Sequence, residues 1–360
     1  MSIESEFKKN DITVIDRLDT LSINSLAKSV ASKLSKAFPN QNLSYRNLFI
    51  EISRIPMYIA NMPEGIAEAF YCSKNSSIYF KDGTPLDELE KSATHEIIHY
   101  LQEIKDKKGK LKRLGLCDLT GVNPYGLALN EGAVQLAASK SDKQSPEMVK
   151  YYDITFSTIS PSYYPLLCNL VSQLVYISDE DLFYDSLFFG TTEYHKELIY
   201  LLGERNFFAI QDKLDDLLNI EEEIIKTNLK LFAPECTTKQ AFKYGKIIEK
   251  CKKNIKKCFF DIQSLIFTSY FNKEFSKLNT TAEIEDYRCR LYNYKNLIGI
   301  TDGYTQFNDF YVHKMEQLEE KYEKIINNVA LVPLNNSKIF TLFKSIKKIF
   351  GLNKEKEYNN

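Results

Sequence analysis

Two histidines and a glutamate lie within five consecutive residues, in the order His95-Glu96-Ile97-Ile98-His99. On a helix, residues four apart lie one turn above each other on the same face, so His95 and His99 can share one divalent cation. Glu96 is rotated by about 100° from His95, so its carboxylate can reach a water on the cation without being a ligand. The spacing therefore predicts a zinc site in which Glu96 is the general base for a zinc-bound water.

The residues around the motif favour a helix beneath such a site. Apart from the motif itself, the stretch from Ser92 to Leu101 carries no charge, as a buried helix requires. Thr84 is expected to be the N-cap, Pro85 the first helical residue, and Asp87 a carboxylate at the positive end of the helix. The alternative is a core helix with two buried and hydrogen-bonded histidines.

A catalytic zinc needs a third protein ligand and an open fourth position. Glu131 is the best candidate, because it stands alone among Leu, Ala, Gly and Val in the segment 126–138. Burying such a carboxylate is costly unless it is paired or bound to a metal. Gly132 is expected to let this second helix approach the motif helix closely. His195 is the alternative third ligand, and a Glu131 paired with a lysine is the interpretation without a metal.

The two motifs together resemble those of the gluzincin metallopeptidases, the broad thermolysin-like group. The motifs are His95-Glu96-x-x-His99 and Asn130-Glu131, whose glutamate follows His99 by thirty-two residues. The resemblance implies one zinc ion per chain, a water activated by Glu96, and hydrolysis of peptide bonds. It also implies that His95, His99 and Glu131 are the zinc ligands and that Glu96 is the catalytic base.

The resemblance covers roughly residues 66–135 and departs from the group at one position. Many gluzincins carry an acidic residue four positions after the ligand glutamate, where it orients a histidine. Here that position is Gln135. An amide oxygen also accepts a hydrogen bond from an imidazole N–H, so the same orienting contact is expected from Gln135.

Metallopeptidases of this type need a further donor to stabilise the oxyanion of the transition state. Tyr163, Tyr164, Tyr194 and His195 are the candidates, and the sequence does not choose among the four.

A hairpin is expected just before the motif helix, with strands at Ala67 to Cys72 and Ser77 to Lys81. The strand Ser77 to Lys81 either forms the edge along which an extended peptide docks or only covers the helix.

Composition narrows the function classes. The chain has 360 residues and a net charge of −1, and no basic and aromatic interleaving indicates a nucleic-acid partner. The seven cysteines are odd in number and scattered, as in a reduced protein. The sequence contains no Sec signal and no run of eighteen apolar residues, so a cytoplasmic protein is expected.

The predicted fold class is α+β and predominantly α-helical. A small β-hairpin or sheet packs on a zincin-like core around the His-Glu-x-x-His helix, and an antiparallel helical bundle follows. Residues 1–205 are expected to form the gluzincin-like metallopeptidase domain. Residues 206–330 are expected to form the bundle, because apolar residues recur there at spacings of three and four, and a homotypic coiled coil is the alternative.

Residues 331–360 are expected to form a basic amphipathic tail helix and a disordered C-terminus. Within the tail, residues 338–350 place apolar side chains on one side of a helix and lysines on the other. This pattern fits a membrane surface, a groove of a partner protein, or the end of the bundle.

A peptide or protein substrate is the partner expected for an active enzyme. The alternative function is a non-enzymatic helical interaction protein, at a membrane surface or on another protein, whose zinc site is vestigial or structural. The oligomeric state is left open by the sequence.

Overall fold

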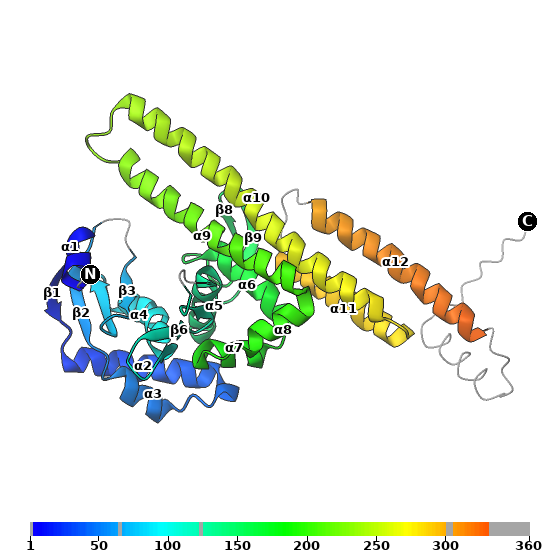
Figure 1. The fold of residues 1–360 in the computed structure, drawn as a ribbon, viewed down its shortest axis with the longest axis horizontal. Coiled ribbons are helices and arrows are strands. Elements are labelled where there is room, and N and C mark those ends of the chain that lie inside the picture. Colours follow the sequence, from blue (N-terminus) through cyan, green and yellow to red (C-terminus); the bar gives the residue numbers. More distant parts are fainter. Residues whose placement is uncertain (1–2, 64–66, 122–124, 300–304, 331–360) are drawn as a thin grey trace, which may run out of the picture.

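The computed structural model describes residues 3–63, 67–121, 125–299 and 305–330 (Figure 1). The fold is α+β, with 66% of the chain helical and only small sheets, as the sequence predicts. The predicted tail at residues 338–350 lies outside the described residues. Within the described part of the chain, no helix is both long and apolar enough to cross a membrane.

A four-stranded sheet forms the N-terminal part of the fold, in the order β1 (Thr13–Arg17), β2 (Met57–Asn61), β4 (Ser77–Lys81) and β3 (Ala69–Cys72). β2 and β4 run parallel, and the other two pairs are antiparallel. Successive side chains of β4 point to opposite faces of the sheet. Ile78 and Phe80 belong to the main core on one face, and Tyr79 packs edge-on against Phe7 of α1 (Ile3–Lys9) on the other.

The predicted hairpin is present, with Cys72 opposite Ser77, and of the two roles that the sequence left open for the strand Ser77 to Lys81, the edge role is excluded. β4 is paired on both sides and therefore cannot receive a peptide. β3 is the edge strand instead. β4 is not an edge strand because β2 pairs with its other side. β2 follows Pro56 as a short apolar strand without clear alternation.

Helix α4 (Leu86–Leu101) carries the His-Glu-x-x-His motif and packs on β3, β4 and α2 (Thr20–Ala37). Its start differs from the prediction. Pro85 occupies the N-cap position, and Thr84 donates its hydroxyl hydrogen bond to the carbonyl oxygen of Lys81 rather than capping the helix. The turn after β4 therefore engages Thr84, and the helix begins one residue later than expected.

Helix α5 (Leu127–Ser141) is the centre of the molecule and is buried on almost all sides. It packs on α4 and on α6 (Pro165–Ile177). Gly132 does allow a close approach, but its partner is α6 and not the motif helix. A Cβ at Gly132 would lie 2.8 Å from Val171 Cγ2 and 3.1 Å from Leu167 Cβ.

Several shorter elements surround this centre. They are η1 (Pro39–Gln41), α3 (Tyr45–Ile52), β5 (Glu103–Lys105), β6 (Leu111–Leu114), β7 (Cys117–Asp118), β8 (Glu147–Tyr151), β9 (Ile154–Thr158), α7 (Glu180–Phe189) and α8 (Glu193–Leu202). β5, β6 and β7 form one antiparallel sheet, and β8 and β9 form a hairpin.

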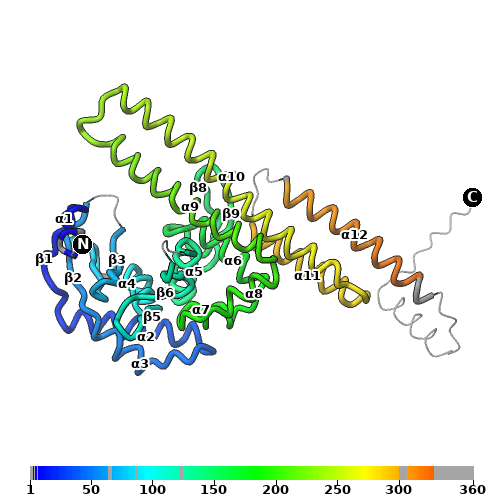
Figure 2. Tube along the Cα trace, viewed as in Figure 1, coloured from blue at the N-terminus to red at the C-terminus, as the bar shows by residue number. Residues whose placement is uncertain are grey.

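The C-terminal helices pair in sequence order. α9 (Glu204–Leu231) and α10 (Thr238–Lys277) form a long antiparallel hairpin, and α11 (Thr281–Ile298) pairs with α12 (Thr305–Ala330). Capping boxes at Thr237 and Thr280 fix the starts of α10 and α11. Figure 2 shows the α9–α10 hairpin extending past the body on one side, while α12 extends on the other.

One hydrophobic core joins both halves of the described chain. It runs from Ile23 in α2 to Leu318 in α12 without interruption. The N-terminal half of α9 packs on α5, the helix that carries Glu131, and α10 packs on α6. The α9–α10 hairpin therefore supports α5 both directly and through α6. Tyr294 of α11 reaches the same layer, where its hydroxyl donates to Gln173 Oε1 of α6 at 2.7 Å.

Candidate metal centre

The motif helix brings both histidines together as its periodicity predicts. The Nε2 atoms of His95 and His99 lie 3.0 Å apart. His99 is buried with 5% of its surface exposed, and His95 is half-buried. Both rings therefore point to one place at the side of α4, and their second nitrogens face away from it.

Glu131 of α5 completes the cluster. Its Oε2 atom lies 3.5 Å from the Nε2 atom of His95 and 3.5 Å from that of His99. Among the described residues, His95, His99 and Glu131 are the group of donors that converges tightly enough to hold a metal ion.

The triangle has the size that a small divalent cation requires. Ligand atoms at about 2.0–2.1 Å from a tetrahedral zinc ion are separated from each other by about 3.3 Å. The measured separations are 3.0, 3.5 and 3.5 Å. Two imidazole nitrogens and one carboxylate oxygen also form a donor set that zinc accepts. The residues therefore fit a three-ligand zinc site.

The electrostatics of Glu131 suit this role. Burial opposes the ionisation of its carboxyl group, but the neighbouring imidazoles of His99 and His95 outweigh this effect and hold its pKa well below the usual range. The carboxylate is therefore negatively charged at neutral pH, as a metal ligand must be.

Asn130 holds Glu131 in place from the residue before it. Its side chain is fully buried, and its Oδ1 accepts hydrogen bonds from the backbone N–H of Leu116 at 3.0 Å and from Gln102 Nε2 at 3.3 Å. Gln102 is the C-cap of α4, so these bonds tie together the two helices that carry the candidate ligands. Gly115 makes room for them, because a Cβ there would lie 2.5 Å from Asn130 Oδ1.

Sequence reasoning identified Asn130 only as part of a motif and missed Gln102 and Gly115 altogether. A buried Asn directly before a ligand Glu was the available signal for Asn130. No local pattern marks the other two, because their role depends on the contact between α4 and α5.

Gln135 makes the contact that the sequence predicts for it. Its Oε1 lies 2.9 Å from His95 Nδ1. Its Nε2 donates to Ser160 Oγ at 3.0 Å, and Ser160 in turn donates to the carbonyl oxygen of Tyr163. Because the Ser160 hydroxyl uses its proton on Tyr163, it must accept from the Gln135 side-chain NH2. The side-chain amide of Gln135 is therefore oriented with its oxygen towards His95. The proton of His95 therefore sits on Nδ1, and Nε2 is left free to bind a cation.

The two histidines are not held equally. The buried Nδ1 of His99 has no hydrogen-bond partner among the described residues. His95 is therefore the more firmly oriented of the two ligands.

Glu96 lies beside the cluster without joining it. Its carboxyl group is half-buried, and burial raises its pKa to about 7, aided by the charge of Glu131 and opposed by His95 and the backbone N–H of Tyr71. Tyr71 belongs to the edge strand β3. Glu96 therefore lies between the candidate metal site and the open edge of the sheet.

Tyr164 is the one of the four oxyanion candidates that lies at the cluster. Its ring stacks on the ring of His95 with centroids 6.0 Å apart. Burial and the carboxylates of Glu131 and Glu96 raise its pKa, so its hydroxyl keeps the proton and remains a donor. Tyr164 has a φ of 47°, a strained conformation for a tyrosine, at the N-cap of α6.

The other three candidates lie elsewhere. Tyr163 donates to Glu68 Oε2 at 2.6 Å, and Tyr194 is fully buried beside Ser178. His195 packs edge-on against Phe207, and burial lowers its pKa to about 4. His195 is therefore not part of the described metal cluster.

In comparisons with known proteins, no protein-family model, curated protein or solved structure matches the chain.

Proposed function

We propose that this protein is a zinc-dependent peptidase with a zincin-like core around α4 and α5. The observation that carries the proposal is the triangle of His95, His99 and Glu131, whose donor atoms are spaced as a tetrahedral zinc requires. Glu96 and Tyr164 lie next to this triangle and add a proton acceptor and a proton donor.

Each residue has a distinct task in the proposed reaction. Zinc, when bound, supplies the Lewis acidity that acidifies a water and polarises the peptide carbonyl. Glu96 accepts the proton of the attacking water on its carboxylate and passes it to the departing amide nitrogen. Tyr164 donates its hydroxyl hydrogen to the carbonyl oxygen as negative charge develops there. Gln135 keeps His95 in the required tautomer.

The edge of β3 offers a place for an extended peptide. The backbone N–H of Lys81 donates to the carbonyl of Glu68, so alternate residues of β3 bond to β4. Ala69 and Tyr71 then direct their backbone groups away from β4. The N–H of Tyr71 already faces Glu96, so a peptide paired along this edge passes next to the proposed base.

Metal content tests the first half of the proposal. We expect about one zinc per chain in purified wild-type protein by mass spectrometry, and its loss in His95→Ala and Glu131→Ala. His313→Ala is the matched control, because His313 lies exposed on α12 and its loss should leave the zinc in place. Wild-type protein that binds no zinc even when zinc is supplied would refute the site.

Hydrolysis tests the second half. Wild-type protein should cleave fluorescein-labelled casein, and Glu96→Gln should lose this activity while keeping its zinc. Unchanged cleavage by Glu96→Gln would refute the mechanism. Zinc in the wild-type protein without cleavage of casein or of a broad peptide mixture would favour the non-enzymatic alternative, in which the metal site is structural.

A further inference from the structure

The far end of the α9–α10 hairpin projects beyond the body of the protein (Figure 1). The hairpin leaves the body near Tyr151 and Tyr152, which lie close to Glu221 of α9 and Cys251 of α10. At 1.5 Å per residue, the helices continue for about 15–20 Å past this point. We call residues 225–253 the hairpin tip.

The hairpin tip exposes large apolar side chains that its own packing does not use. Ile224, Ile248 and Cys251 are buried and form the seam between the two helices. Outside the seam, Phe232 is 80% exposed and Phe242 is 68% exposed, and Ile225 and Leu229 are exposed as well. Four exposed apolar residues at the end of one projection indicate a contact surface.

The hairpin tip is also strongly basic. It contains eight lysines and two glutamates, a net charge of +6, or +4 when the adjoining Glu222 and Glu223 are included, while the whole chain carries −1. Two of the lysines pair with glutamates, Lys226 with Glu222 and Lys252 with Glu249. The other six have no ion pair among the described residues; they are Lys230, Lys239, Lys243, Lys246, Lys250 and Lys253. The positive charge is therefore available to an external anion.

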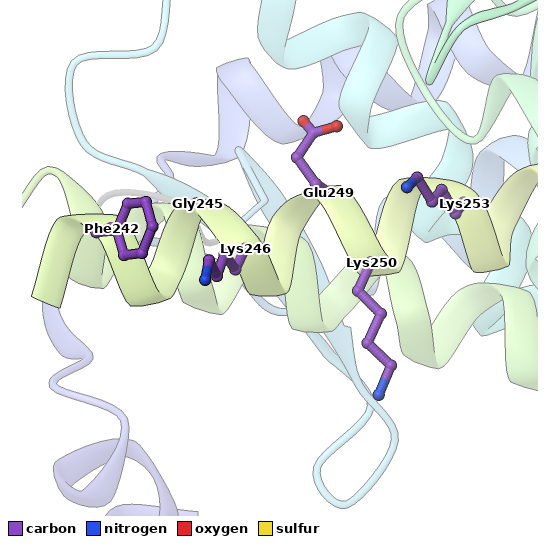
Figure 3. Close-up of a pocket in the computed structure, with 6 residues that line it drawn as sticks. All are labelled: Phe242, Gly245, Lys246, Glu249, Lys250 and Lys253. Atoms are coloured by element: carbon purple, nitrogen blue, oxygen red, sulfur yellow. The ribbon is translucent and has the colours of Figure 1, made fainter.

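One side of α10 shows how the two properties combine. Figure 3 shows Phe242, Gly245, Lys246, Glu249, Lys250 and Lys253 around a shallow hollow of about 510 Å³. The Lys246 ammonium lies 4.4 Å from the ring centroid of Phe242. A Cβ at Gly245 would have no atom within 4 Å, so this part of the helix is open.

We propose that the hairpin tip binds the surface of an anionic lipid bilayer. Lysines beside exposed aromatic and aliphatic side chains match the two layers of such a surface, phosphate head groups above and acyl chains beneath. Aliphatic residues such as Ile225 and Leu229 favour lipid over nucleic acid, which offers them no apolar layer. The proposal does not depend on the activity of the metal centre.

The charge of the hairpin tip argues against two other occupants. The segment 338–350 of this chain carries four lysines and no acidic residue, so it repels the tip. The tip of a second copy repels it for the same reason. An anionic membrane is the occupant whose charge and apolar layer both fit.

Vesicle sedimentation tests the proposal with the full chain. The protein should sediment with vesicles of phosphatidylcholine and phosphatidylserine and remain in solution with phosphatidylcholine alone. Each lysine near an anionic membrane contributes about five-fold to binding, so changing Lys239, Lys243 and Lys250 to Glu should weaken binding at least about a hundred-fold.

A matched control separates location from net charge. Lys107, Lys108 and Lys110 are exposed in the β5–β6 loop, and changing all three to Glu alters the net charge by the same amount. This control should bind the vesicles nearly as the wild type does. Equal losses of vesicle binding in both triple variants would overturn the proposal. Wild-type vesicle binding by the tip variant would also overturn it, and would point to the segment 338–350 as the membrane contact.

Fluorescence tests the apolar contact directly, because the chain contains no tryptophan. Phe242→Trp should shift its emission to shorter wavelength and resist aqueous quenchers when anionic vesicles are added. Tyr292→Trp is the control, since Tyr292 is 55% exposed on α11, and its emission should not change. The proposal would be overturned if the emission wavelength of Phe242→Trp did not shift. It would also be overturned if the protein bound duplex DNA but no vesicles, and if this DNA binding survived Phe232→Ser.

Discussion

Glu221 is a buried carboxyl group whose cost to stability should depend on pH. It lies on α9 with 6% of its surface exposed, and its Oε1 has no hydrogen-bond partner among the described residues. Burial raises its pKa to about 7, although a hydrogen bond with Tyr151 acts in the opposite direction. The neighbouring Tyr151, Tyr152 and Cys168 have pKa values raised by burial, so they stay neutral up to pH 8.

The magnitude follows from proton linkage. The folded state holds the Glu221 proton more tightly than the unfolded chain, whose pKa is 4.5. The contribution of Glu221 to stability is therefore greatest below pH 4.5, falls as the pH rises from 4.5 to 7, and levels off above 7. The penalty is below about 1 kcal/mol at pH 5 and about 3 kcal/mol at pH 8. Glu221→Gln should thus stabilise the protein by about 2–3 kcal/mol more at pH 8 than at pH 5.

Urea denaturation followed by circular dichroism at the two pH values measures this difference. Any constant effect of burying the amide of Glu221→Gln cancels in the comparison. Glu222→Gln is the control, because Glu222 is exposed and its ion pair with Lys226 should contribute little at either pH. Equal changes in the free energy of unfolding at pH 5 and pH 8 would refute the reasoning, since Glu221 would then ionise without penalty.

Two further predictions concern the candidate metal centre, and a third concerns the packing of α5 on α6. Gln135→Leu should weaken zinc binding about 10- to 100-fold in a chelator competition, because His95 loses its hydrogen-bond acceptor. Gln135→Glu should bind zinc at least as tightly as the wild type does. Unchanged zinc affinity in Gln135→Leu would show that His95 needs no acceptor. Tyr164→Phe should lower kcat on casein about a hundred-fold with little change in KM, and a loss confined to KM would exclude the proposed donor role. Gly132→Ala should lower the free energy of unfolding by about 1–2 kcal/mol in urea, because its Cβ meets Val171, and a more stable variant would mean that α6 moves aside freely.

The parts of the site that were predictable are those with a local cause. His95 and His99 lie on one face because helical spacing alone puts them there. Glu131 was identifiable because a lone carboxylate in an apolar helix needs a partner. The contact between Gln135 and His95 follows once Glu131 is placed, since residues four apart on α5 share a face.

The parts that were not predictable depend on which elements meet. Four side chains were equivalent candidates for the oxyanion donor, and only the packing of α6 beside α4 brings Tyr164 to His95. Gly132 signalled a close contact but not its partner, because a missing side chain does not indicate which helix fills the space. The sequence left open whether β4 is an edge strand, because β2 is too short to be distinguished from a loop by its pattern.

The sequence by itself determined the helices, the donor types and the spacing of the motif, because these depend on residues within one or two turns of each other. It also determined the basic and apolar character of the α9–α10 loop region. Tertiary structure decided the rest: the third vertex of the metal triangle, the clamp between Gln102 and Asn130, and the projection of the hairpin tip. Each of these joins segments far apart in the chain, and their meeting is set by the shared hydrophobic core rather than by any local pattern.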